Sequence, residues 1–167
     1  LVAAGDVDCP GAELTARLIE RYPRATVAAL GDLTYNHGDY HKCYDPSWGR
    51  SKHRTRPALG NHDYEGPHRD AREYFEYFGA NAGPPELGFY PYDLGSWHVI
   101  VINSEIVGKG KFGMPEAAMY TFLKNDLRIN KAECTIAYFH DPPFSSGRHV
   151  SAWMRPIYKI LDDGGVD

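Results

Sequence analysis

Four polar side chains of types that bind metal ions stand at the ends of short apolar runs in the sequence. They are Asp6, Asp32, Asn61 and His140, and a glycine precedes the first three. Carboxylate, amide oxygen and imidazole donors suit iron, manganese or zinc rather than a thiolate-preferring metal. Because ligand sites in open α/β sheets form outside the carboxyl ends of strands, we expect the four side chains to converge at one sheet edge. The glycines would let the backbone turn sharply there and leave room for a ligand.

Each of these positions, taken alone, has a simpler interpretation. Gly-Asp after a strand is common in turns and at helix N-caps. The Asn61-His62-Asp63 step after a glycine is compatible with an ordinary polar turn. Four such positions on one alternating pattern of strands and helices are harder to explain as independent turns, so their combination favours a metal site.

The elements that must position these side chains begin with a strand, a helix and a second strand. Apolar runs at Leu1–Gly5 and Ala25–Leu30 flank a helical pattern at Glu13–Tyr22. This order is typical of a βαβ unit, in which neighbouring strands are parallel. The residues predicted to share the inward face of the helix are Leu14, Leu18, Ile19 and Tyr22.

The rest of the chain continues this alternation, which predicts an α/β fold. The Gly95-Ser96 step between two predicted strands indicates a hairpin. Further strands are expected at Arg56–Leu59, Phe89–Leu94, Trp97–Asn103 and Cys134–Phe139, and helices at Arg69–Phe78, Pro115–Ile129 and Ser151–Asp163.

Length and composition describe one ordinary globular domain. The 167 residues are 43% hydrophobic and 24% charged, which excludes a disordered tail, a collagen-like fibre and a coiled coil. A net charge of −4 without a basic stripe argues against nucleic acid as a partner. No apolar run approaches the ~20 residues that span a bilayer. Strand patterns stand at both ends of the chain, so we expect residues 1–167 to be a single domain truncated at both ends.

The three cysteines are too few for a disulfide scaffold. Cys9 and Cys43 follow the ends of neighbouring predicted strands, so they either form a disulfide or remain free, buried thiols. A bridge would support an oxidising, extracytoplasmic compartment. Cys134 opens a predicted core strand and is expected to be free and buried.

Four short motifs, taken together and in order, resemble the calcineurin-like metallophosphoesterases, specifically their purple-acid-phosphatase-type branch. The resemblance covers nearly the whole chain. It implies a two-sheet β-sandwich flanked by helices, the four-layer metallophosphatase fold, with its C-terminal part missing. The motifs are Gly5-Asp6, Gly31-Asp32-Leu33-Thr34-Tyr35, Gly60-Asn61-His62-Asp63 and Ala137-Tyr138-Phe139-His140.

The resemblance also implies a role for each potential metal ligand. Asp6 and Tyr35 would bind a first metal ion, and Asn61 and His140 would bind a second. Asp32 would bridge the two ions. The implied cofactors are two metal ions, Fe(III) with Fe, Zn or Mn, because the hard phenolate donor favours a trivalent metal at the first position.

The implied activity is hydrolysis of a small phosphate monoester, with a diester as the second choice, by attack of a metal-bound hydroxide. His62 would act beside the phosphate as hydrogen-bond donor or general acid. His37, Tyr64 and His149 lie near the motifs and are candidates for substrate binding, with ordinary loop residues as the alternative. The resemblance further implies a secreted or extracytoplasmic protein, and it leaves the oligomeric state open.

The sequence departs from the family pattern at two places. Relatives in the wider superfamily read Gly-Asp-x-His at the first motif, whereas Asp8 holds the fourth place here, either as a carboxylate behind the metal or as a solvent-facing turn residue. The family's last motif, GHxH, supplies one histidine to each metal, and no histidine follows His149. We expect this motif beyond Asp167. The alternative is a degenerate relative that binds metal or phosphate without catalysis.

Overall fold

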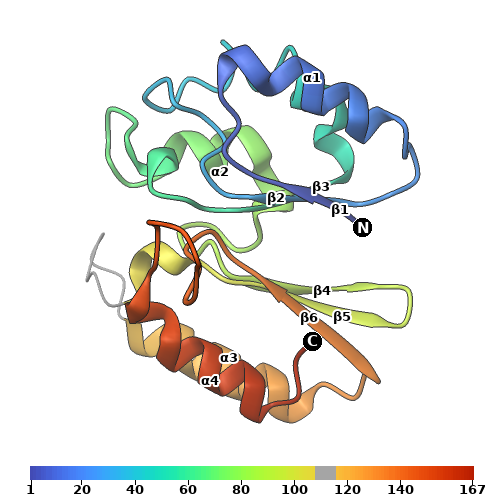
Figure 1. Ribbon diagram of the computed structural model, residues 1–167, viewed down its shortest axis with the longest axis vertical. Coiled ribbons are helices and arrows are strands. Elements are labelled where there is room, and N and C mark those ends of the chain that lie inside the picture. The colour runs from blue at the N-terminus through green and yellow to red at the C-terminus, as the bar shows by residue number, and fades with distance from the viewer. Residues whose placement is uncertain (108–115) are drawn as a thin grey trace.

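Two three-stranded sheets face each other, and helices cover the outer face of each sheet (Figure 1). This is a computed structural model, which describes residues 1–107 and 116–167. The first sheet contains β1 (Val2–Ala4), β2 (Val27–Leu30) and β3 (Thr55–Ala58) and lies under α1 (Cys9–Glu20) and α2 (Arg72–Phe78). The second contains β4 (Tyr90–Leu94), β5 (Trp97–Val101) and β6 (Cys134–Tyr138) and lies against α3 (Glu116–Ile129) and α4 (Arg155–Asp163). The predicted two-sheet α/β sandwich is confirmed.

The first sheet is entirely parallel, with strand order β1-β2-β3. Val2 pairs with Val27, which in turn pairs with Thr55, so the three strands start side by side. The predicted βαβ unit is therefore confirmed. Because parallel strands share a direction, the loops after β1, β2 and β3 leave the sheet at the same edge.

The second sheet combines an antiparallel hairpin with a parallel crossover. β4 and β5 are antiparallel and meet at the predicted Gly95-Ser96 turn, where Gly95 has φ +65°. β5 and β6 are parallel, and the helix α3 connects them. His140 lies two residues after the carboxyl end of β6.

The interface between the two sheets fixes how their edges align. Small alanines of the first sheet pack there against larger side chains of the second. Buried tyrosine hydroxyls of the second sheet donate hydrogen bonds to backbone carbonyls of the first. The hydroxyl groups of Tyr90 and Tyr138 donate to the carbonyls of Pro57 and Arg56 at 2.8 Å. Such bonds satisfy polar atoms that would otherwise be costly to bury. The buried residues of this interface are Ala28, Ala58, Tyr90, Val99, Val101 and Tyr138.

The face of α1 that packs on the sheet differs from the predicted one. Ala12, Ala16 and Ile19 are buried, so of the four predicted inward residues only Ile19 is correct. The helix begins at Cys9, four residues before its predicted start, and its two alanines belong to the buried cluster that includes Val27 and Ala29 of β2. A prediction from hydrophobicity alone places the larger side chains, rather than the alanines, on the inward face of this helix. The exposed residues are Leu14, Leu18 and Tyr22.

The other predicted helices are present with shifted starts. α2 begins at Arg72 rather than Arg69 because Ala71, with φ 58°, breaks the helical backbone before it. The predicted first residue of α3, Pro115, lies outside the described residues. Pro156 occupies the first turn of α4, where its fixed backbone is tolerated. No helix in the described part of the chain is long and apolar enough to cross a membrane.

A disulfide between Cys9 and Cys43 joins the start of α1 to the loop after β2. The two Cα atoms are 5.2 Å apart, within the usual range for a bridge. Cys134 is free, as predicted, but it is half-buried rather than buried because it stands at the very start of β6. The bridge ties the loop that carries Asp6 to the loop that carries Tyr35.

Candidate metal centre

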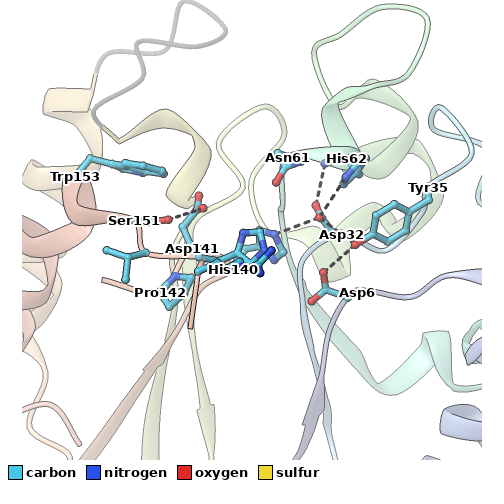
Figure 2. A pocket seen from close by; sticks show the side chains of 13 residues that line it. Asp6, Asp32, Tyr35, Asn61, His62, His140, Asp141, Pro142, Ser151 and Trp153 are labelled. Carbon is cyan, nitrogen blue, oxygen red and sulfur yellow. Dashed lines mark hydrogen bonds and ion pairs between the residues drawn. The ribbon is translucent and has the colours of Figure 1, made fainter. Parts of the chain in front are cut away.

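All five predicted metal ligands line one cleft of about 820 Å³ (Figure 2). Four of them follow β1, β2 and β3, and the fifth follows β6, so the cleft lies where the carboxyl ends of the two sheets meet. One ligand atom from each of Asp6, Asp32 and His140 can be chosen so that all three lie within 4.8 Å of one another. The predicted convergence of these side chains is therefore confirmed. The five residues are Asp6, Asp32, Tyr35, Asn61 and His140.

The aspartates themselves make the sharp turns at the strand ends. Asp6 and Asp32 have φ of 55° and 52°, a left-handed conformation that aspartate tolerates better than most residues. The expectation that glycine makes all three turns is wrong, since only Gly31, with φ +87°, has a positive φ among the three preceding glycines. Sparsely populated backbone conformations of this kind cluster at functional sites.

The glycines instead leave space for the ligand side chains. A Cβ atom on Gly31 would lie 2.7 Å from the Cβ of His140. A Cβ atom on Gly60 would overlap the carboxylate of Asp32 and lie 2.9 Å from the His140 ring. Any larger residue at either position would therefore displace Asp32 or His140.

Asp32 is the central residue of the cleft and is only 3% exposed. Its Oδ1 accepts the backbone N–H of His62 at 2.8 Å, and its Oδ2 lies 3.2 Å from Nε2 of His140 and 3.4 Å from the Tyr35 hydroxyl. Burial alone would raise the pKa of Asp32, but the hydrogen bond and charge of His140 outweigh it and hold that pKa below its usual value. Asp32 thus contacts residues from three loops, Tyr35 after β2, His62 after β3 and His140 after β6.

His140 is oriented by the backbone of the neighbouring sheet. Its Nδ1–H donates to the carbonyl of Leu30 at 2.9 Å, which leaves Nε2 facing Asp32. A backbone acceptor on one ring nitrogen is the usual arrangement behind a metal-binding histidine. Burial opposes the charged ring, yet the contact with Asp32 raises the pKa of His140 to about 9. The two residues therefore form an ion pair, and a metal ion at Nε2 would have to displace a proton.

Tyr35 is directed at both aspartates. Its hydroxyl donates to Oδ1 of Asp6 at 2.8 Å and lies 3.4 Å from Oδ2 of Asp32. Burial and these two carboxylates raise the pKa of Tyr35 above its ordinary value. A phenolate at this position needs a cation beside it to offset the two negative charges. A metal ion held by Asp6 and Tyr35 would meet that need.

The loop of Asn61 and His62 is fixed by a buried carboxylate, Asp63. Its oxygens accept the backbone N–H groups of Leu33 and Gly60, each at 2.9 Å, and the hydroxyl of Tyr40 at 2.7 Å. Complete burial raises the pKa of Asp63 to about 7. These bonds clamp the loops after β2 and β3 to each other and so set the positions of Asn61 and His62.

His62 faces the centre from above the Tyr35 ring, with the two ring centroids 4.2 Å apart. Nδ1 lies 2.9 Å from Oε2 of Glu65, and Nε2 lies 3.9 Å from Oδ2 of Asp32. Because a carboxylate only accepts, Glu65 holds the proton on Nδ1. Glu65 was not singled out from the sequence, although its place three residues after His62 makes the contact possible.

The three candidates for substrate binding lie in different places. His149 lines the cleft, but His37 and Tyr64 are not among the described residues that do so. Tyr64 is buried, and its hydroxyl accepts from the side chain of Asn103 at 2.7 Å, so its position does not support the predicted substrate contact. His37 lies on an exposed turn with φ 51°. Asp8 is a turn residue as well, because its side chain caps α1 at the N–H of Cys9.

The wall of the cleft opposite the aspartates was largely missed from the sequence. It is formed by the loop after β6 and the turn before α4 (Figure 2). No periodic pattern marks these positions, and only the contact between the two sheets brings them to the cleft. They are Asp141, Pro142, Arg148, His149, Val150, Ser151 and Trp153.

The donor set fits a pair of hard or borderline metal ions. It offers carboxylate, phenol, amide and imidazole groups, and no cysteine lines the cleft among the described residues. Such donors are typical ligands of iron, manganese and zinc. The short distances among Asp6, Asp32 and His140 are compatible with ions that share a carboxylate.

A comparison with protein families identifies this architecture. The family model of the calcineurin-like phosphoesterases matches residues 2–167, nearly the whole chain. A comparison with curated proteins gives no match. The family's activity is metal-dependent hydrolysis of phosphoester bonds, in agreement with the donor set of the cleft. The chain belongs to the calcineurin-like phosphoesterase family.

Proposed function

We propose that this chain is the catalytic domain of a two-metal phosphatase of the purple-acid-phosphatase type, which hydrolyses small phosphate monoesters. The observation that carries the proposal is the position of Asp32. It is buried, and its Oδ2 lies 3.4 Å from the Tyr35 hydroxyl and 3.2 Å from Nε2 of His140, while Asp6 and Asn61 line the same cleft. A single carboxylate between two sets of ligands is the arrangement that a shared metal pair requires.

The residues divide into two ligand sets around Asp32. Asp6 and Tyr35 would hold Fe(III), and Asn61 and His140 would hold Fe, Zn or Mn. When bound, two such ions neutralise the phosphate charge and lower the pKa of a water molecule to near neutrality. The hydrogen bond from Tyr35 to Asp6 already brings the first pair of ligands together.

The remaining polar residues of the cleft would act on the substrate itself. In its imidazolium form, His62 would donate the Nε2 proton to the leaving oxygen, since Nε2 faces the centre while Nδ1–H donates to Glu65. Arg148 and His149 lie on the opposite wall, where they would bind phosphate oxygens. The Cys9–Cys43 bridge supports an oxidising, extracytoplasmic compartment for the protein.

Metal content and turnover, measured together, test the proposal. We expect the full protein to contain two metal ions per chain by elemental analysis and to hydrolyse an aryl phosphate monoester. Removal of the ions with a chelator should abolish hydrolysis, and their return should restore it. Bound metal without hydrolysis of monoesters or diesters would instead favour a binding protein without catalysis. A protein that binds no metal would contradict both.

A further inference from the structure

The wall opposite the aspartates carries apolar side chains that face the cleft. Val150 and Trp153 line it while they remain 39% and 36% exposed. Figure 2 shows Trp153 on one side of the cleft and Asp32 with Tyr35 on the other. Exposed apolar groups inside a cleft generally mark a place where an apolar part of a ligand packs.

This wall is anchored rather than loose. The backbone N–H of Ser151 donates to the carbonyl of Pro142 at 2.8 Å, and its hydroxyl donates to Oδ1 of Asp141 at 2.9 Å. Met154, next to Trp153, is fully buried in the core beneath α4. Val150 and Trp153 therefore alternate with buried anchors, and their exposure follows from the way the turn is held.

The size of the cleft leaves room for more than a phosphate group. Its volume of about 820 Å³ is in the range of pockets that accept whole drug-sized ligands. With the phosphate between Asp32 and the Arg148–His149 part of the opposite wall, the alcohol part of the ester would extend towards Val150 and Trp153. An indole ring binds flat aromatic groups better than it binds hydrated polyols, because stacking adds to the burial of apolar surface.

We infer that Val150 and Trp153 form a leaving-group subsite that selects phosphate monoesters of aromatic alcohols, with Trp153 as the specificity-determining residue. This inference rests on the proposed function. It specifies the class of alcohol in the phosphate ester. The assignment of the metal ligands does not depend on it. No bond is made or broken by either side chain.

The test compares two substrates in two tryptophan variants. 2-Naphthyl phosphate offers a flat aromatic alcohol, and glycerol phosphate offers a small polar one. In Trp153→Ala we expect kcat/KM for 2-naphthyl phosphate to fall about tenfold, the usual worth of one aromatic contact, with little change for glycerol phosphate. For each substrate, kcat/KM of the variant is divided by kcat/KM of the wild type. The different acidities of the two alcohols therefore cancel in this ratio.

The matched control is Trp97→Ala. Trp97 is 40% exposed, much like Trp153, but it stands at the start of β5 and is absent from the cleft lining. It should change neither ratio. Trp153→Phe, which keeps an aromatic ring, should recover most of the loss.

The outcomes separate the inference from the function beneath it. Equal losses for both substrates in Trp153→Ala, or no loss for either, would overturn the subsite while leaving the phosphatase intact. A metal-loaded wild type that hydrolyses neither substrate would overturn the proposed function, and the subsite with it. If Trp153→Ala proves unfolded by circular dichroism, the Trp153→Phe and Trp153→Leu pair gives the same comparison, with loss expected only for leucine.

Discussion

Two clusters in this molecule each combine one histidine with two aspartates, yet their geometry differs in a way that separates chemistry from stability. In the cleft, His140 gives one ring nitrogen to a backbone carbonyl and turns the other towards Asp32, within reach of Asp6. In the second sheet, both ring nitrogens of His98 are bound by carboxylates, Asp93 at 2.9 Å and Asp126 at 2.8 Å.

The direction of the ring nitrogens explains why only one cluster can hold a metal. The two nitrogens of an imidazole point away from each other, so carboxylates bound to both cannot share one ion with the ring. His98 is therefore saturated by its neighbours, whereas Nε2 of His140 and the carboxylates of the cleft face a common point. The presence of one histidine and two aspartates alone does not distinguish the two clusters.

The two clusters also differ in the backbone that carries their aspartates. Asp93 lies in β4, where it pairs with His98 across the hairpin, and Asp126 lies in α3. Asp6 and Asp32 lie in loops with left-handed backbone. Regular elements hold the cluster that joins β5 to α3, and strained loops at the strand ends hold the cluster that we expect to perform the chemistry.

The largest expected effect is that of Asp32→Asn on metal binding. The variant keeps the shape of the side chain but removes the charge that both ions would share. We expect the loss of metal and activity to exceed the 10–100-fold typical of residues that merely support a ligand. Elemental analysis and kcat measure the two quantities. Asp162→Asn, on the exposed side of α4, is the control and should change neither. Retention of both ions by Asp32→Asn would contradict the bridging role.

His62→Ala should separate catalysis from metal binding. The side chain contacts Asp32 but is not among the expected ligands, so both metal ions should remain. Loss of a positioned acid lowers kcat by about 10²–10⁴-fold. The loss should be smaller for an aryl phosphate whose leaving group needs no proton than for an alkyl phosphate. Metal loss equal to that of Asp32→Asn would show that His62 is a ligand instead.

Asp126→Ala should damage stability without touching the chemistry. Its side chain is 8% exposed, and removing one partner of a buried ion pair costs about 3 kcal/mol of unfolding free energy. The side chain of Asp93 is 79% exposed, so Asp93→Ala should cost less than about 1 kcal/mol. Urea unfolding of both variants measures the difference, while metal content and kcat stay at the wild-type values. Metal loss in Asp126→Ala would contradict the claim that the His98 cluster serves stability alone.

The smallest expected effect is the pH dependence of that stability. Burial alone would lower the pKa of His98, but Asp93 and Asp126 raise it above 6.5, the ordinary value for the unfolded chain. The contribution of His98 is therefore fully present below about pH 6.5 and is lost as the pH rises through the higher folded-state pKa. Unfolding free energies from pH 6 to 9 should fall more steeply for the wild type than for His98→Gln. Parallel curves would show that folding does not raise the pKa of His98.

The sequence predicted the parts of this structure that depend on local pattern. Apolar runs located the six strands of the described residues, and the motifs at their ends located the candidate ligands that line the cleft. The inward face of α1 was wrong because Ala12 and Ala16, rather than the larger Leu14 and Leu18, pack on the sheet. Close packing of small residues leaves little trace in a hydrophobicity pattern.

The parts that could not be predicted depend on segments that meet only in the folded chain. The pairing of Cys9 with Cys43 stayed open because it depends on the distance between two loops. Val150 and Trp153 reach the cleft because the two sheets stack, and no spacing in the sequence indicates that contact. Tyr64 lies beside a motif in the chain but is directed into the core.

The central claim is that Asp32 lies between two metal ions, and anomalous diffraction from crystals of the metal-loaded protein tests it most directly. Data collected at the absorption edges of iron, zinc and manganese locate each ion by element. The account predicts two peaks, one beside Asp6 and Tyr35 and one beside Asn61 and His140, with Asp32 in contact with both. It predicts none at His98. A single peak, or two peaks of which only one touches Asp32, would contradict it.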